Sequence, residues 1–152
     1  MENKTFDYVK YNTMEGSNKK RICGYFVVSD LHKSNDVAIR LRTEELVEEI
    51  EKHNDWILES IIWEANHKVD TNRKGLNTIL EKAQNDDFDI LLLHHVTLIS
   101  RQGSKTFDFV LQLDKLNKTV YGIIDNIYSL DDLAESMHLT IANRKKYEEY
   151  RK

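Results

Sequence analysis

Four short apolar runs alternate with amphipathic segments along this chain, and the alternation restricts its fold more than any other feature. The runs, rich in β-branched, leucine and aromatic residues, span 22–28, 56–63, 89–96 and 119–124. Segments with apolar residues at helical spacing span 37–53, 72–83, 104–116 and a stretch from about 130. Apolar runs of this kind are typical of parallel strands that helices cover on both faces. The pattern predicts a three-layer α/β domain with a mostly parallel sheet of four to five strands and a C-terminal helix.

The first 21 residues differ from the rest of the chain. They show neither helical nor strand periodicity, and Gly16-Ser17-Asn18 is typical of a flexible linker. We therefore expect a flexible arm over residues 1–21 and one domain over residues 22–152. A chain of 152 residues can bury about 70% of its unfolded surface, so one self-supporting core is feasible.

The residue patterns of two predicted helices indicate how each helix would pack. In residues 37–53, apolar side chains at helical spacing are expected to face the core: Val37, Leu41, Leu46, Val47 and Ile50. The glutamates of that helix are expected to face the solvent. Ser129 with Asp132 predicts a capping box that starts the C-terminal helix near residue 130. One stripe of that helix would pack on the sheet or form a dimer seam: Leu133, Met137 and Ile141.

Charge and composition exclude several classes of protein. The net charge is -4, but residues 22–140 carry 12 basic and 21 acidic side chains, so this acidic body would not hold a polyanion by charge alone. Residues 1–21 and 141–152 are basic and could contact phosphates. No apolar run approaches the roughly 18 residues of a membrane span. Cys23 is the single cysteine, and the chain shows no secretory signal, so we expect a cytoplasmic protein without a disulfide.

Functional residues in an open parallel sheet gather beyond the carboxyl ends of the strands. Here these ends are Ser29-Asp30, Glu64-Ala65-Asn66, Thr97–Arg101 and Asp125-Asn126. Ser29 is well placed for a nucleophile, although no histidine is placed by sequence to act as its base. The separated acids are expected to be caps and solvated loop residues: Glu64, Asp125, Asp131 and Asp132.

Other sites are not predicted. The chain contains neither GxGxxG nor GxxxxGK[ST], which argues against a nucleotide-binding loop. His94 and His95 are neighbours in an expected strand, so they would point to opposite faces and could not share a metal ion. We therefore expect neither a metal nor a cofactor.

Three segments together resemble the catalytic domain of the serine recombinases, which include resolvases, invertases and serine integrases. The segments are Gly24–Ser29, Asn72–Leu76, and Asp87–Leu92 followed by Ser100-Arg101. The resemblance covers about residues 22–145 and implies a resolvase-like fold. It also implies site-specific DNA strand cleavage by a serine, a 5′-phosphoserine intermediate and religation without a cofactor, often on a mobile element. Carried over, Ser29 matches the nucleophile, and Arg73 and Arg101 match arginines that bind the scissile phosphate.

The chain departs from the family pattern at four positions. Val27 replaces an arginine two residues before the serine, and Thr97-Leu98 replaces an aspartate-arginine pair. Arg42 stands where the family has a glutamine. Because the loss of one transition-state donor lowers a rate by about 10²–10³, a degenerate active site with impaired cleavage is expected. Whether the protein is an enzyme therefore stays open.

The resemblance also implies partners. Family members continue from the last helix into a DNA-reading region, which we do not expect within these residues. DNA is the expected partner, bound weakly or indirectly, together with a homo- or heterodimer through the C-terminal helix, and no membrane. Two alternatives remain open: a non-catalytic DNA-associated regulator or oligomerisation partner, and an unrelated flavodoxin-like binding domain.

Overall fold

The structure, a computed structural model, describes residues 6–10, 18–29, 36–66 and 73–152, with the backbone alone for residues 6–10, Ser29, Asp36 and Asn66. Along these residues the strands are β1 (Phe6–Lys10), β2 (Lys20–Ser29), β3 (Trp56–Asn66), β4 (Ile90–Leu93) and β5 (Thr119–Gly122). The helices are α1 (Asp36–Glu51), α2 (Lys74–Gln84), α3 (Gly103–Lys115), α4 (Leu130–Ser136) and α5 (Ile141–Tyr150). A 3₁₀ turn, Val96–Leu98, follows β4. None of the helices in the described ranges is long and apolar enough to cross a membrane.

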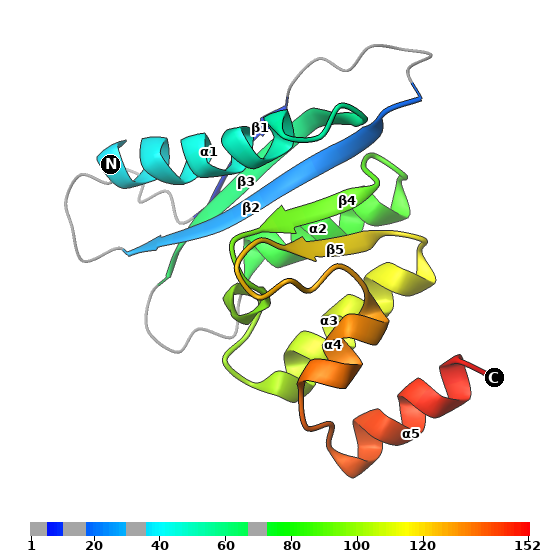
Figure 1. Cartoon of the computed structure of the whole chain (residues 1–152). Coiled ribbons are helices and arrows are strands. Elements are labelled where there is room, and N and C mark those ends of the chain that lie inside the picture. The colour runs from blue at the N-terminus through cyan, green and yellow to red at the C-terminus, as the bar shows by residue number, and fades with distance from the viewer. Residues whose placement is uncertain (1–5, 11–17, 30–35, 67–72) are drawn as a thin grey trace.

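The sheet has the order β1-β3-β2-β4-β5. β2 to β5 are parallel, and β1 lies antiparallel beside β3 at one edge. α1 covers one face over β2 and β3, and α2 and α3 lie against the other face (Figure 1). The predicted three-layer domain with a mostly parallel sheet is therefore confirmed.

β2 is apolar without alternation because both of its faces are buried. Cys23 and Tyr25 pack in the cluster under α2 and α3, while Ile22 and Phe26 pack in the cluster under α1. Gly24 allows α1 to come close, since a Cβ there would lie 2.9 Å from Leu46 Cδ1. The central strand thus supplies side chains to both cores, as a doubly covered parallel strand must.

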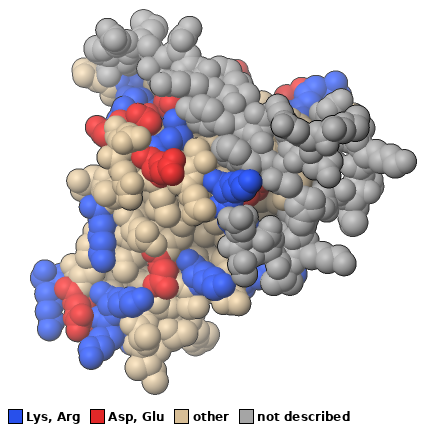
Figure 2. Space-filling model, turned by 180° about the vertical axis from the view of Figure 1, so that it is seen from behind, with Lys and Arg blue, Asp and Glu red and all other residues tan. Residues whose placement is uncertain are grey.

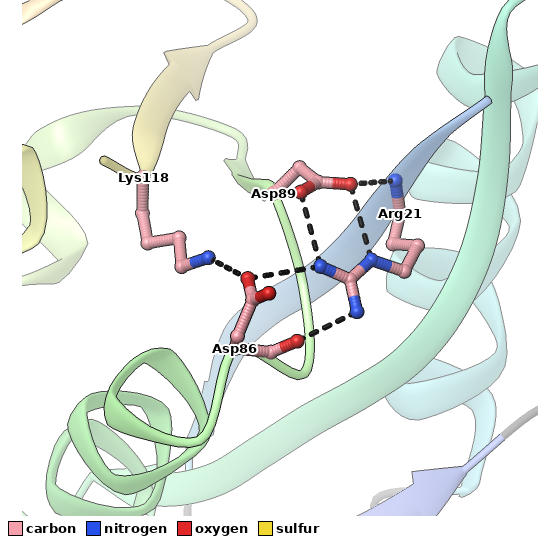
Figure 3. Close-up of polar contacts among 4 residues, drawn as sticks. All are labelled: Arg21, Asp86, Asp89 and Lys118. Atoms are coloured by element: carbon pink, nitrogen blue, oxygen red, sulfur yellow. Dashed lines mark hydrogen bonds and ion pairs between the residues drawn. The ribbon is translucent and has the colours of Figure 1, made fainter. Parts of the chain in front are cut away.

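A cluster of charged side chains lies at the amino edge of the sheet, where the parallel strands begin (Figure 3). Arg21 at the start of β2 donates to Asp89 through its backbone N–H at 2.8 Å and through Nε at 3.2 Å. Its Nη2 donates to Asp86 Oδ1 at 3.0 Å, and the same oxygen accepts from the buried Lys118. The four residues tie together the starts of β2, β4 and β5 and the end of α2.

The expectation of an N-terminal arm without a strand is wrong for part of residues 1–21. Phe6–Lys10 forms β1, in register from Phe6 opposite Glu64 to Lys10 opposite Ser60. β2 also begins two residues earlier than predicted, at Lys20. The pairing of this strand depends on the free edge of β3, which lies far along the chain and leaves no local signal in residues 6–10. The division between residues 1–21 and 22–152 stays a prediction.

The single C-terminal helix predicted from about residue 130 is wrong in its length. Ser129 caps α4 by accepting from the Asp132 backbone N–H, as predicted, but the helix ends at Ser136. Met137 is extended (φ -125, ψ 154), and Thr140 caps a separate helix, α5. Because the helix is interrupted, the expected apolar stripe does not form. Leu133 is buried, whereas Ile141 is 91% exposed.

Two further expectations differ from the structure. The run over residues 89–96 forms a strand only to Leu93, so His94 and His95 leave the sheet and their ring centroids lie 5.9 Å apart. Within the described ranges, however, no three His, Cys, Asp or Glu side chains gather in an arrangement that could hold a metal ion.

In α1, Val37 and Leu41 are exposed instead of packed in the core.

Candidate active site at the carboxyl edge of the sheet

Arg73, the residue before α2, lies at the centre of a hydrogen-bond network at the carboxyl edge of the sheet. Its Nε donates to Glu64 Oε2 at 3.3 Å, and its Nη2 donates to the Tyr25 hydroxyl. Nη1 and Nη2 also donate to the backbone carbonyls of Ile99 (3.2 Å) and Leu98 (2.9 Å). One guanidinium therefore joins β2, β3, α2 and the turn after β4.

Tyr25 and Glu64 reach Arg73 because they project from neighbouring strands on the same face. In the parallel pair, Tyr25 lies opposite Ile62, and Glu64 follows two residues later on β3. The Tyr25 hydroxyl donates to Glu64 Oε2, and the backbone N–H of Gly75 donates to Glu64 Oε1 at 3.3 Å. A buried tyrosine hydroxyl and a buried carboxylate thus satisfy each other.

Gly75 is required by this packing. A Cβ at residue 75 would lie 2.7 Å from Glu64 Oε2 and 2.9 Å from Glu64 Cδ. Real Cβ atoms do not approach this closely, so a larger residue would displace the carboxylate or the first turn of α2. The arginine-x-glycine-leucine start of this helix, Arg73 to Leu76, therefore has a local structural reason.

The network fixes the protonation of two members. Burial opposes the charge of Arg73, but Tyr25 and Glu64 outweigh it, and the pKa of the guanidinium is raised above its usual value. Burial, followed by the charge of Glu64, raises the pKa of Tyr25 far above its ordinary range. At neutral pH Arg73 is a cation and Tyr25 is a neutral hydrogen-bond donor.

Of the other two predicted site residues, only Arg101 has a described side chain. Ser29 is the last residue of β2 and lies in register with Asn66, and its side chain is outside the described part of the structure. Asp30 and Asn72 also lie outside the described residues. Arg101 is exposed and makes no hydrogen bond or ion pair with the described residues. Among the described side chains, Arg73 contacts Tyr25 and Glu64 near the strand ends, and Arg101 contacts neither.

The positions that depart from the family pattern supply no replacement cation. Val27 and Leu98 are partly buried and pack against the core cluster that contains Tyr25. Thr97 is exposed, and its hydroxyl contacts His95 Nδ1. Arg42 pairs with Glu45 on α1, Nη1 to Oε1 at 3.2 Å, with both side chains substantially exposed.

Glu64 is the site residue that sequence reasoning missed. It was expected to be solvated, but its carboxylate is buried and holds Arg73. A signal was available, because Tyr25 lies within an otherwise apolar strand and a buried hydroxyl needs a polar partner. Asp125 was also expected to be a solvated residue, but its Oδ2 accepts from the backbone N–H of Val96 at 2.9 Å and holds the turn after β4.

Several solved structures share this arrangement of elements, although no family model and no curated protein matches the sequence. The N-terminal catalytic domain of TP901-1 integrase is similar at a TM-score of 0.64 and 17% identity, over 85% of this chain and 98% of that chain.

Two further solved structures are similar. The C-terminal catalytic domain of ISC1926 TnpA, an IS607-like serine recombinase, has a TM-score of 0.59 and 14% identity, over 76% of each chain. A resolvase family site-specific recombinase from Streptococcus pneumoniae has a TM-score of 0.56 and 13% identity, over 88% of this chain and 91% of that chain. The described chain, with its mostly parallel sheet, therefore has the fold of the serine recombinase catalytic domains.

Proposed function

We propose that this chain is a serine recombinase-like domain that acts on DNA and whose own strand cleavage by Ser29 is impaired. The observation that carries the proposal is the state of Arg73. A guanidinium has five N–H donors, and four of those of Arg73 are occupied by Tyr25, Glu64 and two backbone carbonyls. One N–H is left for a phosphate oxygen, so this arginine mainly holds the site together.

The surroundings of Arg73 support impaired cleavage. Attack on a phosphodiester needs donors that stabilise the charge developing on the phosphate oxygens, and each missing donor lowers the rate by about 10²–10³. Val27 and Leu98 have apolar side chains and cannot donate. Arg101 remains as an exposed cation whose guanidinium has no partner among the described residues.

DNA remains the proposed partner, bound through cations outside this site. The last 12 residues carry five basic and two acidic side chains. Figure 2 shows basic side chains gathered around α5, with acidic ones between them. Such a surface suits weak contacts with phosphates, whose strength falls with rising salt.

A covalent-capture experiment tests the proposal. The chain is incubated with sheared host DNA and denatured, and the tryptic peptide that contains Ser29, residues 22–33, is examined by mass spectrometry. We expect no nucleotide adduct on Ser29 in the wild type. An adduct that Ser29→Ala removes would overturn the impairment.

A gain-of-function variant tests whether the site is of the recombinase type. Val27→Arg with Thr97→Asp and Leu98→Arg restores the two arginines and the aspartate that the family pattern contains, and we expect an adduct on Ser29 in this variant. Ser29→Ala in the same background is the matched control and should remove the adduct. A variant that folds, as judged by circular dichroism, and still forms no adduct would contradict the recombinase-type assignment.

A second candidate function is a non-catalytic regulator or oligomerisation partner, as a homo- or heterodimer through the C-terminal helix. The observation that favours it is Ile141, an apolar residue at the start of α5 that is 91% exposed. In that case Ser29→Ala leaves the biological activity intact, whereas Ile141→Ser removes it. Met137 is less suited to the test, because it packs against the chain's own core.

A further inference from the structure

One face of α1 is apolar and acidic, and it points away from the sheet. Val37 and Leu41 are 59% and 50% exposed, although their spacing predicted core positions. Glu44, Glu48 and Glu51 continue the same line at helical spacing and are also exposed. We refer to these five residues as the acidic face of α1. Arg40 lies beside it and contacts Glu44 at 4.0 Å.

The outward side of α5 has the opposite charge. Ile141 begins it, and Arg144, Lys145 and Glu148 follow at helical spacing, with Lys152 beyond the helix. Together with Leu139, four of these residues line a shallow cleft of about 320 Å³. We refer to Ile141, Arg144, Lys145, Glu148 and Lys152 as the basic face of α5.

The other side of α5 is already used within the chain. Asn143 Nδ2 donates to Asp108 Oδ1 at 3.1 Å, and the Tyr150 hydroxyl donates to Asp114 Oδ2 at 2.6 Å. Arg151 Nε donates to Asp131 Oδ1 at 2.8 Å. These contacts fix α5 on α3 and α4, so that its basic face stays turned to the outside.

We propose that the acidic face of α1 in one copy of this chain binds the basic face of α5 in a second copy. Both faces run from apolar to charged in the amino-to-carboxyl direction. Two helices lying parallel therefore place Ile141 against Val37 and Leu41, and bring Arg144 and Lys145 near the glutamates. The apolar residues supply burial and the charges select the orientation.

The pairing takes place between copies because α1 and α5 lie at opposite ends of one molecule (Figure 1). A second copy is the occupant that the charges favour, since one sequence carries both complementary faces. This inference deepens the dimer proposed above by naming the surface that receives the C-terminal helix. It does not depend on Ser29 or on DNA cleavage, so the adduct experiment and the association experiment can fail separately. Arg144, Lys145 and Lys152 contact phosphates only in a copy whose basic face is not paired.

A charge exchange tests the pairing. One variant carries Glu44→Lys and Glu48→Lys, and the other carries Arg144→Glu and Lys145→Glu. Sedimentation velocity is measured on the wild type, on each variant and on an equimolar mixture. We expect the wild type to self-associate, each variant alone to associate at least tenfold more weakly, and the mixture to recover association, since every α1–α5 contact between unlike variants is again complementary.

Matched controls separate the interface from general surface effects. Ile141→Ser should weaken association, whereas Ile124→Ser, at an apolar residue that is 59% exposed elsewhere, should not. Glu81→Lys on α2 changes an exposed charge outside both faces and should leave association unchanged. A wild type that stays monomeric at all concentrations, or a mixture of folded variants that fails to associate, would overturn the inference.

Discussion

Lys82 on α2 and Glu59 on β3 form an ion pair inside the core, with Lys82 Nζ 2.9 Å from the carboxylate. Both side chains are buried, and the Ser60 hydroxyl donates a further hydrogen bond to Glu59. The pair ties α2 to the strand whose far end carries Glu64, and thus to the network around Arg73. Removal of one partner leaves an uncompensated charge in the core.

Lys82→Met is therefore expected to destabilise the fold by about 3–5 kcal/mol, the usual loss when one partner of a buried pair is removed. Urea unfolding followed by circular dichroism measures it. The double variant Lys82→Met with Glu59→Met removes both charges and should recover most of the loss. A double variant that is less stable than Lys82→Met would contradict the claim that the unpaired charge of Glu59 causes the loss.

Glu64→Gln preserves the shape of the side chain but leaves Arg73 without its counter-charge. We expect a loss of about 2 kcal/mol, because a hydrogen bond to a charged group contributes about that much. Hydrogen exchange should also become faster in the turn over residues 96–101, where Arg73 donates to the carbonyls of Leu98 and Ile99. Glu81→Gln, an exposed change on α2, is the control and should stay within about 0.5 kcal/mol of the wild type.

Gly75→Ala should be destabilising by about 1–3 kcal/mol, because the new Cβ would press on the Glu64 carboxylate. In an exposed helix the same change is stabilising by up to about 1 kcal/mol, so the sign of the effect tests the packing. Gly103→Ala is a useful comparison, since its Cβ would meet only the flexible end of Met137. Equal effects at both glycines in thermal unfolding would contradict the close contact.

The charge cluster at the amino edge predicts sensitivity to acid. The hydrogen bond from Lys118 lowers the pKa of Asp86; burial opposes ionisation of Asp89, but Arg21 outweighs it, and the pKa of Asp89 is lowered too. Groups with a lowered pKa in the folded state stabilise it above their unfolded pKa, and lose that contribution as the pH falls through the folded pKa. Stability should thus fall from about pH 5 downward, and Asp89→Asn should flatten this fall in urea titrations.

The buried thiol of Cys23 allows a chemical test of how tightly the core is closed. Burial raises the pKa of its thiol to about 12, so the reactive thiolate is almost absent at neutral pH. Iodoacetamide should not modify Cys23 in the folded protein at pH 8, and it should react fully in 6–8 M urea. Rapid alkylation without denaturant would show that the β2 core opens readily.

Much of the fold follows from local sequence patterns. The four apolar runs became β2, β3, β4 and β5, because a strand buried on both faces needs an uninterrupted apolar sequence. The Ser129 cap of α4 was also predicted correctly, since it depends only on a hydroxyl and a backbone N–H three residues away. Phe6–Lys10 was missed because its strand depends on pairing with β3, which lies more than 45 residues further along the chain.

The same contrast between local sequence patterns and long-range contacts holds for the site. The sequence by itself determined the order of the elements, the edge of the sheet where polar residues gather, and the presence of Arg73 at the start of α2. Only the tertiary structure decided what Arg73 does there, because Tyr25, Glu64, Leu98 and Ile99 reach it from three separate parts of the chain. Helical spacing likewise marked Val37 and Leu41 as apolar positions. Their exposure was decided by where α1 lies on the sheet, since periodicity defines a face of a helix and not what covers it.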